Sequence, residues 1–340
     1  MSSTIDGPVP AADATDVPLL EARGLQVHFR QRRGAAVRAV DGVDLCWHRG
    51  EVLGVVGESG SGKSTLGRAL LGLQTPTAGE VLASGRPLRA GNLKTLRRRV
   101  QMVFQDPYQA LSPRQTVGDI VTEPLDIHGV GRKGVERIRC GVAALENAGL
   151  RPAERYWERY SRELSGGQLQ RVAIAAAMVL EPEGLLCDEP VSALDVSVRI
   201  QVLHLLMRLR RERGLGLIFV THDLGLAWTL CDRVAVMYFG RIIEIGTADD
   251  VISRPAHPYT RSLLSAVPTP LPRPGVKRAI LQGEPPDASR VPSGCRFHPR
   301  CPQRFDRCST DDPRELVPAG SETHSAACWL LDGPGPSTRP

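Results

Sequence analysis

The sequence contains a glycine-rich loop of the kind that binds the phosphate groups of a nucleotide. Residues 57–64, GESGSGKS, fit the pattern G-x-x-x-x-G-K-S/T between an apolar strand and a helix. The glycines let successive backbone N–H groups point at phosphate oxygens, and the N-terminus of the helix adds its positive end. Lys63 can place a charge on the β- and γ-phosphates, while the Ser64 hydroxyl can bind Mg²⁺. We therefore expect nucleotide binding by Gly57, Glu58, Ser59, Gly60, Ser61, Gly62, Lys63, Ser64 and Thr65.

Two adjacent carboxylates follow a second apolar strand, GLLCD at 184–188. The chain turns where this strand ends, so Asp188 and Glu189 can approach one site although neighbours within a strand point to opposite faces. We expect Asp188 to bind Mg²⁺ and Glu189 to orient or deprotonate an attacking water. Gly184, at the start of the strand, is an unfavourable residue there and should weaken it slightly.

Two further polar residues also follow apolar strands. His222 comes after GLIFV and can donate a hydrogen bond to the γ-phosphate. Gln105 comes after MVF and can contact Mg²⁺ or the attacking water. Neither residue would be remarkable alone, so both assignments depend on the phosphate loop and the carboxylate pair.

A second glycine-rich loop, ELSGGQLQR at 163–171, has no obvious use if the chain binds one nucleotide. Gly166 and Gly167 let the backbone come close to a phosphate, and Ser165 adds a hydroxyl. A helix beginning after them would direct its positive end at the same phosphate.

Short apolar strands alternate with helical segments, which predicts right-handed crossovers and a parallel sheet. Strands are expected at 51–57, 184–188 and 216–222, and the helix over 198–213 should stop at Gly214. The segment 106–170 is charged and helix-periodic, which predicts an inserted helical subdomain.

The ordered set of GESGSGKS, Gln105, LSGGQ, LLCDEP, SALD and His222 resembles the nucleotide-binding subunit of ATP-binding-cassette (ABC) transporters, over about 20–261. The resemblance implies an α/β P-loop NTPase cassette, with a RecA-like parallel core, an antiparallel β subdomain and an inserted helical subdomain. In that family two cassettes stack head to tail, and each signature loop covers the ATP bound by the other chain. Ser165, Gly166, Gly167 and Gln168 would then contact the partner's ATP, Asp195 would lie in the dimer contact, and Phe29 would stack on adenine, with Val37 as the alternative.

Longer segments look like the oligopeptide/dipeptide importer branch, chiefly MVFQDPYQALSPR at 102–114, HPYTRSLLSAVP at 257–268 and SGCRFHPRCP at 293–302. The first is closer to the second of that branch's two ATPase subunits, although Ser112 and Leu169 depart from the usual residues. This resemblance implies a second ATPase subunit, identical or sister, two transmembrane permease subunits, an extracytoplasmic solute-binding protein, and a permease contact at 105–113. It implies uptake of di- or oligopeptides at the cytoplasmic face of the membrane; an importer for another small solute, such as a metal chelate, is the alternative.

Composition argues against other classes of protein. The 340 residues carry a net charge of +6, no apolar run is long enough to span a membrane, and the first twenty residues lack the basic and apolar parts of a secretory signal. The arginine clusters at 97–99 and 208–213 lack the interleaved aromatics of a single-strand-binding surface, so no nucleic acid partner is expected. A soluble cassette protein often has two cassettes or long coiled-coil insertions, and a phosphate-loop kinase has no use for LSGGQ.

Eight cysteines fall into two groups. Cys46, Cys140, Cys187 and Cys231 have apolar or helical surroundings and are expected as small core residues. The others lie in a Pro-rich tail, and their spacing is too wide for a usual zinc knuckle but is tolerated by an iron–sulfur cluster (4Fe–4S). The resemblance to the importer branch, in which some ATPase subunits carry such clusters, favours iron–sulfur over zinc. Unliganded thiols remain an alternative, and a disulfide is disfavoured in a reducing cytosol. The cysteines of the tail are Cys295, Cys301, Cys308 and Cys328, with His298 and His324 as substitute ligands. We expect a disordered tail at 1–18, an ATPase domain at 19–262 and a C-terminal region at 263–340.

Overall fold

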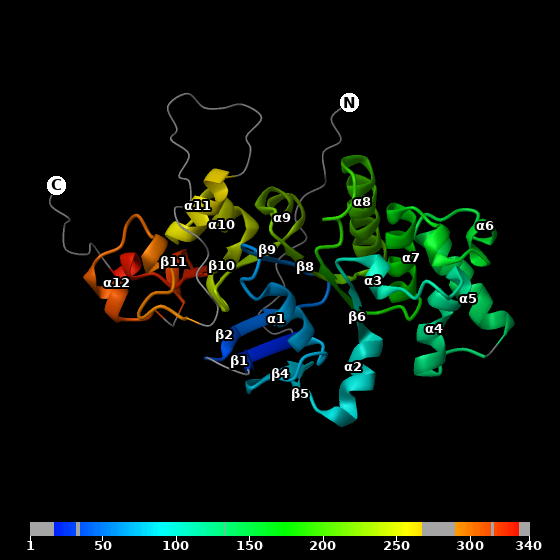
Figure 1. Ribbon diagram of the computed structural model, residues 1–340, viewed down its shortest axis with the longest axis horizontal. Helices are drawn as coiled ribbons and strands as arrows, with labels where there is room; N and C mark the ends of the chain where they lie inside the picture. Colours follow the sequence, from blue (N-terminus) through cyan, green and yellow to red (C-terminus); the bar gives the residue numbers. More distant parts are fainter. Residues whose placement is uncertain (1–16, 32–34, 133, 267–289, 314–315, 333–340) are drawn as a thin grey trace.

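The computed structural model describes residues 17–31, 35–132, 134–266, 290–313 and 316–332. Its main element is an eight-stranded sheet in the order β11-β12-β10-β9-β3-β8-β7-β6 (Figure 1). Among the described residues, the strands from β9 to β6 run parallel, and the other three are antiparallel to their neighbours. The bounds are β3 Val52–Val56, β6 Val100–Val103, β7 Gly184–Asp188, β8 Gly216–Thr221, β9 Arg233–Tyr238, β10 Arg241–Thr247, β11 Val317–Ser321 and β12 His324–Ala326.

The central parallel strands are apolar because both of their faces are covered. Every residue of β3, β7 and β8 is buried, as expected where helices pack on each side of a sheet. Gly184 in β7 has a packing reason: a Cβ there would lie 2.3 Å from Cη2 of Trp47. Glycine is therefore required where the sequence pattern made it look unfavourable.

A second, smaller antiparallel sheet packs against one face of the central sheet. Its strand order is β2-β1-β4-β5, and it shares a hydrophobic core with α1 (Lys63–Leu70) and one face of the central sheet. The strands are β1 Leu20–Phe29, β2 Val37–Trp47, β4 Ala78–Ala83 and β5 Arg86–Pro87, and α2 (Leu93–Arg99) leads from them to β6.

The predicted helical subdomain forms a group of helices at the β6 side of the molecule (Figure 1), and its core is continuous with that of the main sheet. Its helices are α3 Pro107–Ala110, α4 Val117–His128, α5 Val135–Asn147, α6 Glu154–Trp157 and α7 Gly166–Met178. Trp157 lies against Gly118 and Gly141, where a Cβ would approach its ring within 2.5 and 2.8 Å. Together with the mixed sheet, this arrangement confirms the predicted fold class.

The remaining helices pack along the strands. They are α8 Val196–Arg213, α9 Leu224–Leu230, α10 Ala248–Ser253 and α11 Pro258–Ala266. As predicted, α8 ends at Gly214, whose φ of 61° places it in the left-handed region. Of the helices that the structure describes, none combines the length and the apolar character needed to cross a membrane.

The C-terminal region is joined to the main sheet. Strand β12 pairs with β10 through Glu244–Ala326 and Ile245–Ser325, and β11 continues the sheet beyond it. The short helix α12 (Asp306–Thr310) lies at the same end of the molecule (Figure 1). The expected N-terminal tail falls outside the described residues except for Val17 and Pro18, and the Pro-rich stretch 267–275 lies outside them entirely.

Candidate functional site

The phosphate loop connects β3 to α1 at the carboxyl edge of the parallel strands. Gly57 and Gly62 have φ values of 155° and 105°, which favour glycine. Space also requires it: a Cβ at Gly57 would lie 2.2 Å from the carbonyl oxygen of Met237, and one at Gly62 would lie 2.0 Å from that of Ala39. The loop is therefore held tightly between β2 and β9.

Lys63 is 5% exposed and turns back on the loop. Its Nζ donates hydrogen bonds to the carbonyl oxygens of Gly57 and Glu58, at 2.9 and 2.8 Å. Burial lowers the pKa of Lys63, and nearby carboxylates, chiefly that of Glu189, oppose the shift. The ammonium group is thus within the loop that it was predicted to serve.

Ser64 and Asp188 form an oxygen pair next to this loop. Ser64 Oγ donates to Asp188 Oδ1 at 2.8 Å. Asp188 is 1% exposed; its burial raises its pKa, and the hydrogen bond from Ser64 works in the opposite direction. A hydroxyl beside a carboxylate suits Mg²⁺, which prefers oxygen ligands.

Glu189 lies between the two polar residues that were predicted to share its site. Gln105 Nε2 donates to Glu189 Oε2 at 3.2 Å, and His222 Nδ1 lies 3.3 Å from Glu189 Oε1. Glu189 has a φ of 45°, which is uncommon for a residue other than glycine and turns the chain away from β7. Because its two oxygens are oriented by an amide and an imidazole, Glu189 is suited to hold and activate a water.

Phe29 and Val37, the two candidates for contact with a base, are register partners where β1 ends and β2 begins. The Phe29 side chain is exposed, with 41% of its surface accessible. An exposed ring at a strand end is free to stack on a flat ligand.

The second glycine-rich loop begins α7, which lies apart from α1 (Figure 1). Ser165 caps this helix through Gln168 N, and Gln168 Oε1 accepts from Ser165 N in return. A Cβ at Gly167 would lie 2.4 Å from Cγ1 of Val198 in α8, whereas one at Gly166 would meet nothing closer than 3.7 Å. Gly167 therefore has a packing role, which sequence reasoning did not anticipate.

Asp195 caps α8 by accepting from Val198 N at 3.0 Å. It thus lies on the helix against which Gly167 packs. In the described part of the chain, no hydrogen bond connects Asp195 or residues 165–168 to the phosphate loop. The structure brings the first loop together with Gln105, Asp188, Glu189 and His222, whereas the second loop lies apart from the first (Figure 1).

The four C-terminal cysteines line one small pocket, together with residues that include His257, Phe297 and His298. Burial raises the pKa of Cys295, Cys301 and Cys328 to about 11. Among the described residues, no three His, Cys, Asp or Glu side chains are arranged so as to hold a metal ion. The thiols are therefore gathered, but they do not form a ligand set in this conformation.

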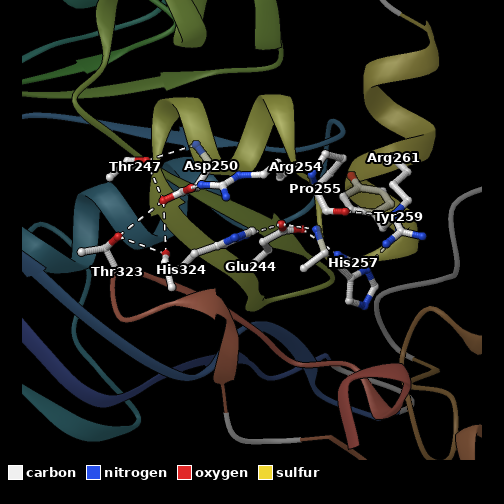
Figure 2. Close-up of polar contacts among 12 residues, drawn as sticks. Glu244, Thr247, Asp250, Arg254, Pro255, His257, Tyr259, Arg261, Thr323 and His324 are labelled. Atoms are coloured by element: carbon white, nitrogen blue, oxygen red, sulfur yellow. Dashed lines mark hydrogen bonds and ion pairs between the residues drawn. The ribbon is translucent and has the colours of Figure 1, made fainter. Parts of the chain in front are cut away.

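His324, named as a substitute ligand, is not part of that pocket. Its Nε2 lies 2.7 Å from Oε1 of Glu244, a fully buried carboxylate that also accepts from Ala256 N and His257 N (Figure 2). Closeness in sequence was misleading here because β12 pairs with β10 and brings His324 onto Glu244. Of the other four cysteines, Cys187 and Cys231 are buried, while Cys46 and Cys140 are half-buried.

Sequence reasoning also missed two residues that contact the phosphate loop. Tyr259 Oη accepts from Glu58 N at 2.9 Å, and Arg300 donates to both carboxylate oxygens of Glu58 at 2.7 and 3.1 Å. The segments 257–268 and 293–302 contain these residues, and their sequences stand out only for their resemblance to the importer branch. No local pattern indicates contacts across 201 and 242 positions of sequence.

Two family descriptions match the chain. "ABC transporter" covers residues 40–192, and "Oligopeptide/dipeptide transporter, C-terminal region" covers residues 243–308. The chain is 47% identical to a putative peptide import ATP-binding protein of Brucella ovis, over 92% of this chain and 98% of that protein. It is 45% identical to the oligopeptide transport ATP-binding protein OppF of Escherichia coli, over 92% of this chain and 96% of that protein.

Solved structures show the same similarity. The ATP-binding cassette MJ0796, a dimer in a post-hydrolysis state bound to ADP and Pi, superposes with a TM-score of 0.61 at 29% identity, over 67% of this chain and 98% of that one. The protein cbiO1 of Clostridium perfringens, part of the transporter complex cbiONQ, has a TM-score of 0.60 at 30% identity, over 70% of this chain and 92% of that one.

Proposed function

Because this chain belongs to the ABC transporter family, in its oligopeptide/dipeptide branch, we propose that it is the ATP-hydrolysing subunit of a membrane importer for di- and oligopeptides. The observation that carries the proposal is the contact of Glu189 with Gln105 and His222, beside the Ser64–Asp188 pair. Two relatives are named for peptide import and oligopeptide transport, which supports a peptide cargo.

Each residue has a defined task in hydrolysis. Lys63 and the N–H groups of the phosphate loop bind the β- and γ-phosphates, and Phe29 stacks on adenine. Ser64, Asp188 and Gln105 would hold Mg²⁺, which would neutralise charge on the phosphate oxygens. Glu189 orients the attacking water and accepts its proton. His222, whose side chain is 61% exposed, donates a hydrogen bond to the γ-phosphate.

A second cassette, identical or sister, completes the site. Ser165, Gly166, Gly167 and Gln168 contact the ATP of the partner, and Asp195 lies in the dimer contact. The support is that this loop starts a helix that lies apart from its own phosphate loop, and that the similar cassette MJ0796 is a dimer. Its helix N-terminus and its capping hydroxyl suit a phosphate brought by another chain.

The complex contains two transmembrane permease subunits, and a solute-binding protein delivers the cargo outside the membrane. The chain is then peripheral, on the cytoplasmic face. The segment 105–113 contacts the permease; its support is Tyr108 in α3, a residue of this segment that is 58% exposed. In the same proposal, residues 19–262 form the ATPase domain and residues 263–340 form the C-terminal region.

Reconstitution of the complete complex in proteoliposomes tests this function. We expect ATP hydrolysis and uptake of a labelled tripeptide to rise together when the binding protein and peptide are present. A complex with Glu189→Gln is the control for coupling. Stimulation by a metal chelate but not by any peptide would overturn the cargo, and absence of hydrolysis in the intact complex would overturn the function.

We also propose that Cys295, Cys301, Cys308 and Cys328 bind an iron–sulfur cluster (4Fe–4S). The support is their common pocket and the suitability of four thiolates for such a cluster. Anaerobic purification followed by iron, sulfide and zinc analysis is the test, with Cys308→Ser as the variant and Cys140→Ser as the control. Zinc without sulfide contradicts the cluster, and neither metal means free thiols.

A further inference from the structure

Glu58, the second residue of the phosphate loop, is bound at three points. Arg300 Nη1 and Nη2 donate to its two carboxylate oxygens, at 2.7 and 3.1 Å. Its N–H donates to Tyr259 Oη at 2.9 Å, and its carbonyl accepts from Lys63 Nζ at 2.8 Å. The C-terminal region is thus connected, through a single residue, to the cation that serves the phosphates.

The ion pair between Arg300 and Glu58 is well formed. A bidentate guanidinium–carboxylate pair fixes geometry as well as charge. The Arg300 side chain is 6% exposed and that of Glu58 is 25% exposed, so water screens the pair only in part. The hydrogen bonds to Glu58 raise the pKa of Arg300 above its ordinary value, which keeps it charged at every relevant pH.

The two residues that contact Glu58 from outside the phosphate loop, Tyr259 and Arg300, are each held by segments that are hydrogen-bonded to the strands or to the turn between them. Glu244 in β10 accepts from the backbone N–H groups of Ala256 and His257, and His257 Nδ1 accepts from Tyr259 N at 3.0 Å (Figure 2). Arg300 follows Arg296, whose guanidinium is hydrogen-bonded to Asp41 in β2 and to the carbonyl oxygen of Phe239. Tyr259 and Arg300 are therefore held in fixed positions where they contact the phosphate loop.

We propose that Arg300 is a positioning residue for ATP binding, which acts by neutralising Glu58 and holding it away from the phosphates. The proposal rests on the proposed function, because it concerns the same phosphate loop. Without Arg300, the Glu58 carboxylate is left as a free negative charge beside the site of a polyanionic ligand, and repulsion between them weakens binding. The freed carboxylate also competes with the phosphates for Lys63.

Charge removal separates this role from simple structural support. Arg300→Gln should raise the KM for ATP about tenfold with little change in kcat, and the increase should shrink at high salt. Glu58→Gln should tighten ATP binding, because it leaves the positive charge of Arg300 uncompensated beside the site of a polyanionic ligand. The double variant Glu58→Gln/Arg300→Gln should recover most of the lost affinity. A purely structural ion pair predicts instead that all three variants weaken binding.

The measurements are ATP titration by calorimetry and steady-state hydrolysis on the full-length chain in its complex. Arg304→Gln, an exposed arginine of the same segment, is the control. If Arg300→Gln does not fold, as shown by its thermal unfolding, the sign of the Glu58→Gln effect decides: tighter binding supports the proposal and weaker binding overturns it. Unchanged affinity in folded Arg300→Gln overturns this inference alone, whereas failure of the unmodified chain to bind ATP overturns the proposed function.

Discussion

Ser64 Oγ donates a hydrogen bond of 2.8 Å to Asp188 Oδ1, although 124 positions separate the two residues. One lies in the first turn of α1 and the other at the last position of β7. The parallel order β3-β8-β7 brings these ends to the same edge of the sheet. The pair therefore links the phosphate loop to the carboxylates, and the predictions below start from it.

Ser64→Ala removes the hydroxyl and leaves Asp188 buried without this partner. We expect the Mg²⁺ concentration for half-maximal hydrolysis to rise at least about tenfold, because losing a proposed ligand should cost no less than losing a group that only orients one. ATP binding without Mg²⁺ should change little. Titration of hydrolysis with Mg²⁺ measures the effect, and Ser253→Ala, at an exposed serine in the last position of α10, is the control. An unchanged Mg²⁺ requirement contradicts the assignment.

Glu189→Gln retains the shape of the side chain but cannot accept a proton. Hydrolysis should fall by about 10²–10⁴, the usual contribution of a general base. ATP should still bind and hold two cassettes together, which size-exclusion chromatography with light scattering would detect. Glu123→Gln, an exposed glutamate of α4, should hydrolyse normally. Hydrolysis by Glu189→Gln at the normal rate would show that another group is the general base.

The two glycines of the second loop should respond differently to alanine. Gly167→Ala places a Cβ 2.4 Å from Val198 and should lower the free energy of unfolding by about 1–3 kcal/mol. Gly166→Ala has room for a methyl group, so stability should stay within about 0.5 kcal/mol. Only hydrolysis by the dimer should fall in this variant.

Urea unfolding and hydrolysis assays distinguish these outcomes. Adding Val198→Ala to Gly167→Ala should recover part of the lost stability, since it removes the clashing methyl groups. Full hydrolysis by Gly166→Ala would mean that the loop does not approach a partner's phosphate closely.

The lowered pKa of Asp41 predicts that the protein loses stability in acid. Its burial favours a higher pKa, but the hydrogen bond and charge of Arg296, with help from His28, lower the pKa to about 2. A lowered carboxyl pKa contributes stability above the unfolded value near 3.8, and the contribution is lost as pH falls towards 2. Asp41→Asn should therefore cost about 2 kcal/mol at neutral pH.

The difference between Asp41→Asn and the unmodified chain should shrink below about pH 4. Urea unfolding at several pH values measures it, with Asp306→Asn as an exposed control. A difference that stays constant down to pH 3 would show that protonation of the Asp41 carboxyl does not account for the loss of stability in acid.

The sequence by itself determined the parts that are local in the chain. The phosphate loop, the carboxylate pair after β7 and the helix stop at Gly214 are each encoded within a few consecutive residues, and strand–helix alternation predicted the sheet. Such features depend on backbone preferences and short spacing, which a single segment carries. The edge of a parallel sheet then explains why Asp188 and Ser64 meet.

Only the tertiary structure decided which distant side chains touch. Gly184 is required by Trp47, His324 pairs with Glu244 instead of joining the cysteines, and Arg300 is bound to Glu58 across 242 positions. The first contact joins β7 to β2, and the other two arise because β12 extends the main sheet and the C-terminal region lies against the phosphate loop. No local periodicity records such a pairing, since it depends on the packing of segments that are far apart in the chain.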